Sequence, residues 1–140
     1  AGREAFKVGD FATACPRFAE SYRLDPAPGA LFNLADCEEQ ADKTASAWQR
    51  WQELVDLLRG TPSDPRFAIA QQHVAALGAK LPKLLLRWKE TPPAGAVVKR
   101  DGVVLGSASI GVPLPVDPGP HVIEVTAKGR RASTVQVLSA

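Results

Sequence analysis

The stretch GDFATACPRFAESYRLDP, residues 9–26, decides the fold that we predict for the first half of the chain. It places a small residue, Ala14, four positions before an aromatic residue, Phe18. The same spacing returns 33 residues later, where Ala47 precedes Trp51. Residues four apart lie on one face of a helix, so each pair sets a recess beside a large side chain and lets another helix pack closely. We therefore predict that the stretch is one half of a repeated helical hairpin.

The residues before the second of these helices complete the second hairpin. In the segment 30–40 the apolar residues Leu31, Leu34 and Ala35 are spaced by three and four positions. This spacing is typical of a helix that buries one face. We predict that this helix, residues 30–40, packs antiparallel against the helix that carries Ala47 and Trp51.

A third amphipathic helix is predicted over PRFAIAQQHVAALGAKLP, residues 65–82. Its apolar residues recur at spacings of three and four. Asp64 can cap the first free amides of this helix, with Pro65 at the first helical position. A repeat buries its apolar face only against a neighbour, so we expect this helix to cover the second hairpin as a cap.

The repeated residues resemble the tetratricopeptide repeat, whose pattern includes Leu-Gly in the first helix, then Ala-x3-Phe and a closing proline. The chain departs from the pattern at Asp42, where a turn glycine is usual, and at Glu38, where an aromatic residue is usual. The first helix of the first hairpin is also short. The residues that carry the resemblance are Gly9, Asp10, Phe11, Ala14, Phe18 and Pro26 in the first hairpin and Leu34, Ala35, Ala47 and Trp51 in the second.

This resemblance implies a groove that binds an extended peptide or a helix on the concave face made by the first helices. Asn33 stands where some members of the family hold the terminal carboxylate of a peptide, although the lysines that accompany it there are not evident here. The alternative is a solvated helix face without a partner. The groove residues carried over from the family are Arg3, Phe6, Lys7, Phe32, Asn33, Asp36, Glu39 and Gln40.

From Leu84 onward the apolar period changes from that of helices to two, which is typical of strands. Leu84, Leu86 and Trp88 would share one face of the first strand. The segment VVKRDGVVLG, residues 97–106, predicts a hairpin, because Asp-Gly tolerates the positive backbone angles of a two-residue turn. Pro113 and Pro115 cannot donate to a ladder, so an edge strand is expected there.

Two more strands are predicted near the end of the chain. HVIEVTA, residues 121–127, and ASTVQVL, residues 132–138, alternate apolar and polar residues on either side of a turn at Lys128-Gly129. We expect a small antiparallel β-sandwich of roughly five or six strands.

The turns and strands over residues 83–139 resemble the PEGA domain, a small β-sandwich of bacterial surface and envelope proteins. The resemblance rests on RDGVVLG and VPLPVDPGPHVIEVTAKGRR. Repeat helices followed by such a domain are similar to exported proteins of myxobacteria and related Gram-negative bacteria. We therefore expect a periplasmic or envelope-associated protein whose leader is not part of this chain.

Cys15 and Cys37 lie on helices that would pack antiparallel around the turn near residues 26–29. A disulfide between them is geometrically reachable, and would close a loop of about 22 residues and add roughly 3 kcal/mol. The alternative is two buried thiols that pack as small apolar groups.

No pattern in the sequence indicates catalysis, a metal or a cofactor. His73 and His121 are the only histidines, and with two cysteines they form none of the usual metal-ligand or nucleophile motifs. The nearest aspartate to His121 is Asp117, across a proline turn, where it is expected to stabilise the turn. We predict a protein that is not an enzyme and that holds no cofactor.

The charge is divided unequally. Residues 1–80 carry nine Lys and Arg against eleven Asp and Glu, and residues 81–140 carry eight against four. No aromatic residues other than Trp88 interleave with the basic ones, so nucleic acid is an unfavoured partner, whereas an anionic envelope polymer or lipid headgroup needs only charge. The residues of the basic β-face are Arg87, Lys89, Lys99, Arg100, Lys128, Arg130 and Arg131.

The sequence as a whole predicts an α+β protein with a helical repeat domain over residues 1–81 and a β-sandwich over 82–140. The expected function is that of a non-catalytic adaptor of the bacterial envelope, in which the groove binds a protein segment and the sandwich docks or anchors. One alternative is a structural subunit that self-assembles through the sandwich into a filament or lattice. Another is a module that binds an anionic glycan. No apolar run approaches the ~20 residues needed to span a bilayer.

Overall fold

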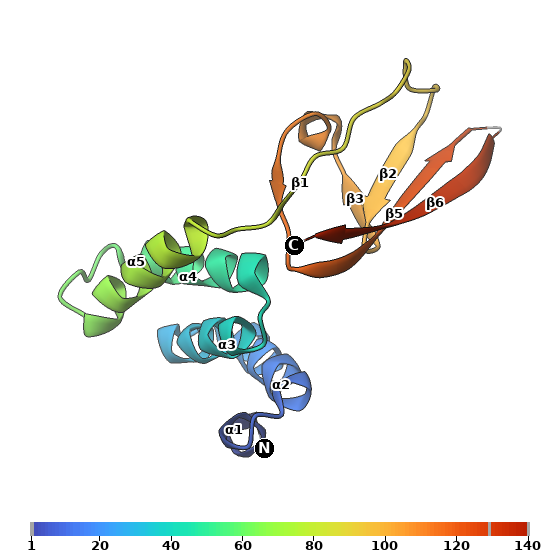
Figure 1. Cartoon of the computed structure of the whole chain (residues 1–140). Helices are drawn as coiled ribbons and strands as arrows, with labels where there is room; N and C mark the ends of the chain where they lie inside the picture. Colours follow the sequence, from blue (N-terminus) through green and yellow to red (C-terminus); the bar gives the residue numbers. More distant parts are fainter. Residues whose placement is uncertain (1, 129, 140) are drawn as a thin grey trace. The chain divides into compact units, whose positions relative to one another are not determined.

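A computed structural model describes the fold of residues 2–128 and 130–139 of the 140-residue chain, with side chains described up to Lys128. The structure is α+β, with helices in the first part of the chain and small antiparallel sheets in the second (Figure 1). The chain divides into two compact units, residues 1–81 and 82–140. They are called the helical unit and the β unit below.

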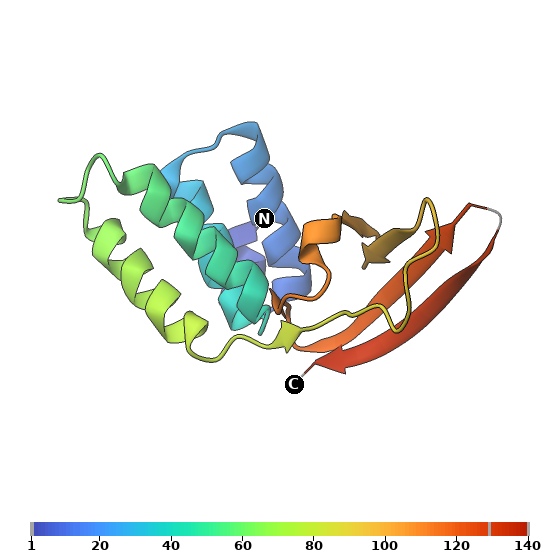
Figure 2. The same cartoon turned by 90° about the horizontal axis from the view of Figure 1, so that it is seen from above.

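The helical unit is a series of helices that each pack on their neighbours in the chain. Figures 1 and 2 show α3, α4 and α5 lying side by side with alternating directions. The helices are α1 (Gly2–Lys7), α2 (Phe11–Leu24), α3 (Pro28–Gln40), α4 (Thr44–Leu58) and α5 (Pro65–Gly78).

The predicted repetition is present in the backbone itself. In the turn before α2, the amide of Asp10 donates to the Ala5 carbonyl at 2.8 Å, and 33 residues later Lys43 donates to Glu38 at 2.9 Å. The residue before each helix has nearly the same dihedral angles, φ −83° and ψ 74° at Asp10 and φ −83° and ψ 71° at Lys43. The two hairpins, α1–α2 and α3–α4, are therefore built on the same turn.

Asp42 explains how the second turn forms without a glycine. Its φ is +58°, close to the +76° of Gly9 at the equivalent position of the first turn. Aspartate is among the few residues with a side chain that tolerate this left-handed region, because its short polar group can hydrogen-bond locally. The departure from the family pattern at Asp42 thus leaves the geometry of the turn unchanged.

The core of the helical unit follows the predicted spacing. Ala14, Ala47 and Trp51 are fully buried and Phe18 is nearly so, as the repeated pair of small and aromatic residues predicted. The larger of two buried clusters consists of Leu31, Ala35, Ala47, Trp51, Leu54, Leu58, Ala70 and Leu77. The smaller cluster consists of Ala14, Cys15, Phe18, Leu34 and Cys37.

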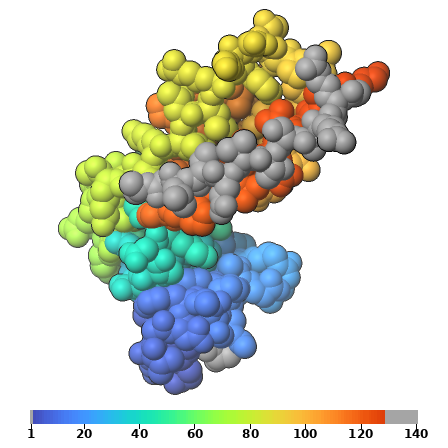
Figure 3. All heavy atoms as spheres, turned by 45° about the vertical axis from the view of Figure 1, so that its right-hand side comes forward, coloured from blue at the N-terminus to red at the C-terminus, as the bar shows by residue number. Residues whose placement is uncertain are grey.

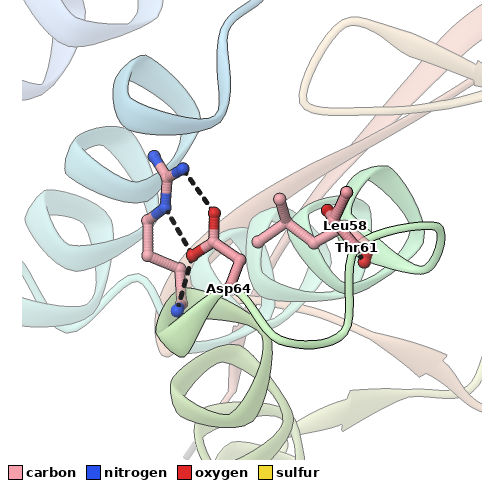
Figure 4. Close-up of polar contacts among 4 residues, drawn as sticks. Leu58, Thr61 and Asp64 are labelled. Carbon is pink, nitrogen blue, oxygen red and sulfur yellow. Dashed lines mark hydrogen bonds and ion pairs between the residues drawn. The ribbon is translucent and has the colours of Figure 1, made fainter.

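Helix α5 begins as the sequence predicted, with Asp64 as its N-cap and Pro65 in the first turn. Figure 4 shows the Asp64 carboxylate turned toward one arginine, Arg66. Asp64 Oδ1 accepts from the backbone amide of Arg66 at 2.9 Å and from its Nε at 3.0 Å, and Oδ2 accepts from Nη2 at 2.6 Å. The hydrogen bonds from the Arg66 side chain and backbone lower the pKa of Asp64 to about 2. The capping group is therefore ionised at neutral pH.

The β unit contains a two-stranded sheet, in which β1 pairs with β4, and a four-stranded sheet of order β3-β2-β5-β6, all antiparallel. The long β5–β6 hairpin is the most extended element of this unit (Figure 2). The strands are β1 (Lys83–Leu84), β2 (Val97–Arg100), β3 (Val103–Leu105), β4 (Leu114–Pro115), β5 (Gly119–Ala127) and β6 (Arg130–Ser139), and a 3₁₀ turn, η1, covers Ser107–Ser109.

The predicted Asp-Gly hairpin is confirmed. Asp101 and Gly102 have φ of +50° and +82°, and Arg100 pairs with Val103 across the two-residue turn. The strands predicted over 121–127 and 132–138 also lie within β5 and β6. Of the predicted turn between them, Gly129 lies outside the described residues.

The first predicted strand of the β unit is wrong beyond Leu84. Only Lys83 and Leu84 join a sheet, where they face Pro115 and Leu114 of β4. The alternation nevertheless appears in burial, since Leu86 and Trp88 are half-buried and Arg87 between them is exposed. The period of two arose because one side of an extended segment lies over the core, without the ladder hydrogen bonds that define a strand.

Candidate functional site

The cysteines form a disulfide that joins α2 to α3. The Cα atoms of Cys15 and Cys37 are 5.5 Å apart, within the usual range for a cystine, and both residues are buried. The bond therefore ties the first hairpin to the second, and confirms the pairing that the sequence left open.

The centre of the second hairpin holds a polar contact on a buried aromatic ring. Trp51 is fully buried on α4, and its Nε1 donates a hydrogen bond to Glu39 Oε2 of α3 at 2.7 Å. Phe32, seven residues before Glu39 on α3, packs edge-on against the indole, and the two ring centroids are 5.1 Å apart. A buried indole N–H usually finds such a partner, because leaving it unpaired costs free energy.

Helix α5 reaches the same point through His73. Its imidazole stacks on Trp51 with centroids 4.2 Å apart and planes at 13°, and its Nδ1 lies 2.7 Å from Glu39 Oε2. The side chains of His73 and Glu39 are 35% and 26% exposed, so the pair borders solvent above the buried ring. Glu39 thus connects α3, α4 and α5 through a single carboxylate oxygen.

We define the α3–α5 face as Phe32, Asp36, Glu39 and His73. The first three lie on one side of α3, because residues separated by four and seven positions share a helix face. Asp36 is half-buried and Glu39 partly exposed, and both carry negative charge. This face is the best candidate for a binding surface in the helical unit, because it combines an aromatic ring, two carboxylates and an imidazole.

The groove residues predicted from the family pattern fall into different environments. Phe6 is half-buried against the smaller core cluster, edge-on to Phe11 at 5.7 Å and Phe18 at 6.1 Å. Its ring therefore packs within the first hairpin. Arg3 and Lys7 of α1 are exposed, and Lys7 lies 3.7 Å from Glu4.

The remaining predicted groove residues lie on α3. Asn33 is half-buried, Gln40 is exposed, and Asp36 and Glu39 belong to the α3–α5 face. Of the predicted residues of α3, the structure brings Glu39 into contact with His73, which was not among the predicted groove residues. A signal for His73 existed, since it lies three positions after Ala70 and four before Leu77 on the apolar side of α5.

Glu38, at the position where the tetratricopeptide pattern that the sequence resembles has an aromatic residue, is buried beside the guanidinium of Arg50 on α4. Arg50 Nε lies 3.7 Å from Glu38 Oε2, and Arg50 Nη1 lies 3.4 Å from Glu53 Oε1. A buried carboxylate with a nearby cation avoids much of the cost of burying an unpaired charge.

The helical unit also has an open groove of about 450 Å³ between α4 and α5. The residues that line it are Gln52, Val55, Asp56, Arg59, Gln71, Val74 and Ala75.

In the β unit, His121 pairs with a different aspartate from the one expected. Its Nδ1 lies 2.7 Å from Asp101 Oδ2, and its Nε2 lies 2.5 Å from the backbone oxygen of Asp117. Asp117 therefore serves as a turn acceptor through its carbonyl, while the carboxylate partner comes from the β2–β3 hairpin. Asp101 Oδ1 also accepts from the Val122 amide at 2.8 Å.

Both ring nitrogens of His121 must donate in this arrangement, because a carbonyl and an ionised carboxylate only accept. The hydrogen bond to Asp101 raises the pKa of His121, against the opposing effect of burial. Burial raises the pKa of Asp101, but hydrogen bonds from His121 and Val122 outweigh it, and the net shift is downward. The pair is a charged clamp that fixes the hairpin turn to β5.

The predicted basic residues of the β unit are distributed over several surfaces. Lys99 and Arg100 are adjacent on β2, so they point to opposite faces of the sheet, with Lys99 opposite Glu124. Arg87, Lys89 and Lys128 are exposed. The side chains of Arg130 and Arg131 lie outside the described residues.

Within the described part of the chain, no three His, Cys, Asp or Glu side chains are grouped so that they could hold a metal ion. None of the described helices has the length and apolar character needed to cross a bilayer. Comparisons with protein-family models, curated proteins and solved structures give no match for this chain.

Proposed function

We propose that this protein is a non-catalytic interaction module of an exported bacterial protein. In this proposal the helical unit is a tetratricopeptide-like array that binds a segment of a partner protein. The β unit is a PEGA-like domain that docks or anchors the array at the cell envelope.

The observation that carries the proposal is the repetition of the hairpin turn after 33 residues, with matching hydrogen bonds and dihedral angles. Hairpins that repeat in this way stack in one direction, and α5 packs on α4 as the next helix of the series. Such arrays present an extended surface along their helices, and binding along that surface is their usual role.

Export is supported by the Cys15–Cys37 disulfide. Disulfides persist in the periplasm and outside the cell, whereas cytosolic thiols are kept reduced. The envelope location goes further than the disulfide alone, and rests on the resemblance of the β unit to the PEGA domain.

The α3–α5 face suggests the chemistry of the partner. Asp36 and Glu39 give the face negative charge, and Phe32 lies beside them. A segment with a basic and an apolar side chain would complement this surface. With only two hairpins the contact area is small, so affinity at a single site is expected to be modest unless several copies bind together.

The test is a crosslinking pull-down from envelope extracts of the source organism with the wild type and the Asp36→Arg variant. Asp36 lies on the α3–α5 face but outside the contact of Trp51 with Glu39, so the variant should fold. Gln71→Arg, an exposed change on another side of α5, is the matched control. The proposal predicts a partner that is lost with Asp36→Arg and kept with Gln71→Arg; retention of the same proteins by both variants would refute it.

A structural subunit remains the second candidate, and the sheet order favours β6 as its contact. The ten-residue β6 is an outer strand of the four-stranded sheet and contains no proline. Long outer strands are templates for pairing with another chain. Light scattering separates the two candidates, because an adaptor keeps its 14.9 kDa mass across concentrations and a lattice former grows.

An anionic-glycan module is the third candidate, supported by the excess of basic residues in the β unit. Its binding would depend mainly on charge and would weaken steeply with salt. The test is binding to an anionic polysaccharide column at low salt, followed by elution with rising salt. The Debye length is about 10 Å at 0.1 M salt, so binding by charge should be lost well below about 0.5 M. Retention of the protein above about 0.5 M salt would contradict this candidate.

A further inference from the structure

The β unit contains an apolar hollow that the proposed function does not use. Two cavities, of about 110 Å³ and about 290 Å³, share the side chains of Trp88, Val98 and Ile110 in their walls. Ile123 and Val125 of β5 complete the smaller one. We call the two together the Trp88 pocket.

The pocket exists because the segment between β1 and β2 covers the sheet without joining it. This segment, residues 85–96, has no ladder partner, and Figure 3 shows it in yellow at the surface of the unit. The buried apolar residues in the described part of the β unit are Val98, Val116 and Ile123. Val98 and Ile123 line the cavities together with Trp88. Trp88 lines both cavities and is only half-buried, so part of its side chain is accessible to another molecule.

Two cations stand beside this apolar surface. Arg87 contributes to the wall of the smaller cavity. Lys128 lies next to the larger one, since a Cβ built on the lining residue Gly95 would be 3.6 Å from the Lys128 Cβ. Neither side chain makes an ion pair with any residue whose side chain the structure describes.

We propose that the Trp88 pocket binds an alkyl carboxylate, with its chain against Trp88, Val98 and Ile110 and its carboxylate at Arg87 and Lys128. The larger cavity lies near the lower end of the range for small-molecule sites, roughly 300–1,000 Å³, so a medium-length chain fits better than a folded or ring-rich ligand. Apolar walls with a few polar groups at the entrance are the usual composition of such sites. The inference is independent of the α3–α5 face.

The experiment uses the full chain and follows the tryptophan indole signals in two-dimensional ¹H–¹⁵N NMR. Octanoate is titrated into the protein, and 1-octanol and octylammonium, which carry the same alkyl chain, serve as ligand controls. A Trp88→Phe variant assigns the Trp88 indole, and the Trp51 indole of the helical unit is the internal reference. We expect octanoate to shift Trp88 in a saturable manner and to leave Trp51 unchanged.

Arg87→Gln is the decisive variant, because Arg87 is exposed and its removal should not affect folding. Losing one charge-assisted contact in a partly exposed site should weaken octanoate binding about fivefold. Lys89→Gln is the matched control, since Lys89 is exposed on the same segment but does not line either cavity, and should change binding less than about twofold.

Each other outcome overturns the proposal. No shift of Trp88 up to the solubility of octanoate would mean that the hollow is a packing defect. Equal binding of octanol would mean that charge has no role, and preference for octylammonium would reverse its sign. Equal loss in Arg87→Gln and Lys89→Gln would show a diffuse electrostatic effect in place of the site described.

Discussion

Trp51 in the helical unit is fully buried between Phe32 and His73, whereas Trp88 in the β unit is half-buried beside a cavity. The difference reflects how each unit covers its apolar side chains. In the helical unit a full-length helix lies on either side of α4, and the repeat brings a complementary surface to each. In the β unit an irregular segment covers the sheet. Stability in the first unit therefore depends on packing, and in the second more on ladder hydrogen bonds and the His121–Asp101 clamp.

The largest expected effect is that of Trp51→Ala. Removing this side chain leaves a cavity under α3 and α5 and leaves Glu39 without the indole donor, so we expect a loss of about 3–5 kcal/mol in the free energy of unfolding. Urea unfolding followed by circular dichroism measures it. Trp48→Ala, at a half-buried position against Gly78, is the control and should cost less. A loss below about 2 kcal/mol for Trp51→Ala would contradict the packing argument.

The next effect is that of removing the disulfide by Cys15→Ala with Cys37→Ala. The bond closes a loop with a sequence separation of 22, for which about 3 kcal/mol of stabilisation is expected. The loss should be confined to the helical unit, and amide hydrogen exchange can assign it. Equal loss of protection in β5 would argue against separate stabilisation of the two units.

A smaller effect, specific to the β unit, is the pH dependence of the His121–Asp101 clamp. The folded pKa of His121 is raised, so its stabilisation is complete below the unfolded value of about 6.5 and is lost as pH rises through the folded pKa. The folded pKa of Asp101 is lowered, so its stabilisation is present above about 3.9 and is lost as pH falls. The clamp should therefore contribute most between about pH 4 and pH 6.5.

Asp101→Asn tests this window. Because the Asp101 side chain is 44% exposed, solvent screening reduces the pair's contribution, and we expect a loss of about 1 kcal/mol at pH 5.5 that shrinks as the pH rises through the folded pKa of His121. Urea unfolding at a series of pH values, followed at the backbone amides of Val122 and Val125, measures the loss. A loss that stays constant as the pH rises would show that the charge on His121 does not contribute.

The smallest effect is expected for Asp64→Ala at the start of α5. The Asp64 side chain is partly exposed and Arg66 remains as a helix residue, so the melting temperature of the helical unit should fall only slightly. Because the pKa of Asp64 is lowered to about 2, its contribution is present above about pH 3.9 and lost as pH falls toward 2. Asp64→Asn retains a capping oxygen, so it should lower the melting temperature less than Asp64→Ala does. The reverse order of melting temperatures would contradict capping as the cause.

Local and repeated signals in the sequence were sufficient for much of the fold. Asp64-Pro65 and Asp101-Gly102 each specify a local backbone geometry, and both lie where they were predicted. The burial of Ala14 and Ala47 was predicted correctly, because it depends only on the helix that carries each alanine and on the helix packed against it. Ser21 and Leu54, which also lie 33 residues apart in the two hairpins, differ in burial. Ser21 is exposed and Leu54 is fully buried, because α2 has only the six-residue α1 as its preceding neighbour.

Non-local contacts were missed for a physical reason. Glu39, Trp51 and His73 lie on three different helices, so their contact depends on how each helix is rotated about its own axis. The spacing of residues within one segment does not specify this rotation. Asp101 and His121 come together through the pairing of β2 with β5, which depends on strand register. Sequence spacing instead pointed to Asp117, the nearest aspartate along the chain.

The Cys15–Cys37 bond also determines how the chain would respond to a mechanical load. A force applied at the two ends of the chain passes through the disulfide, so residues 16–36, which lie between the two cysteines, carry no tension. At about 3.4 Å per extended residue, the contour length released on full unfolding is shorter by roughly 70 Å when the bond is intact. Under such a load the chain would thus become less extensible on oxidation, and reduction of this one bond would restore its full reach.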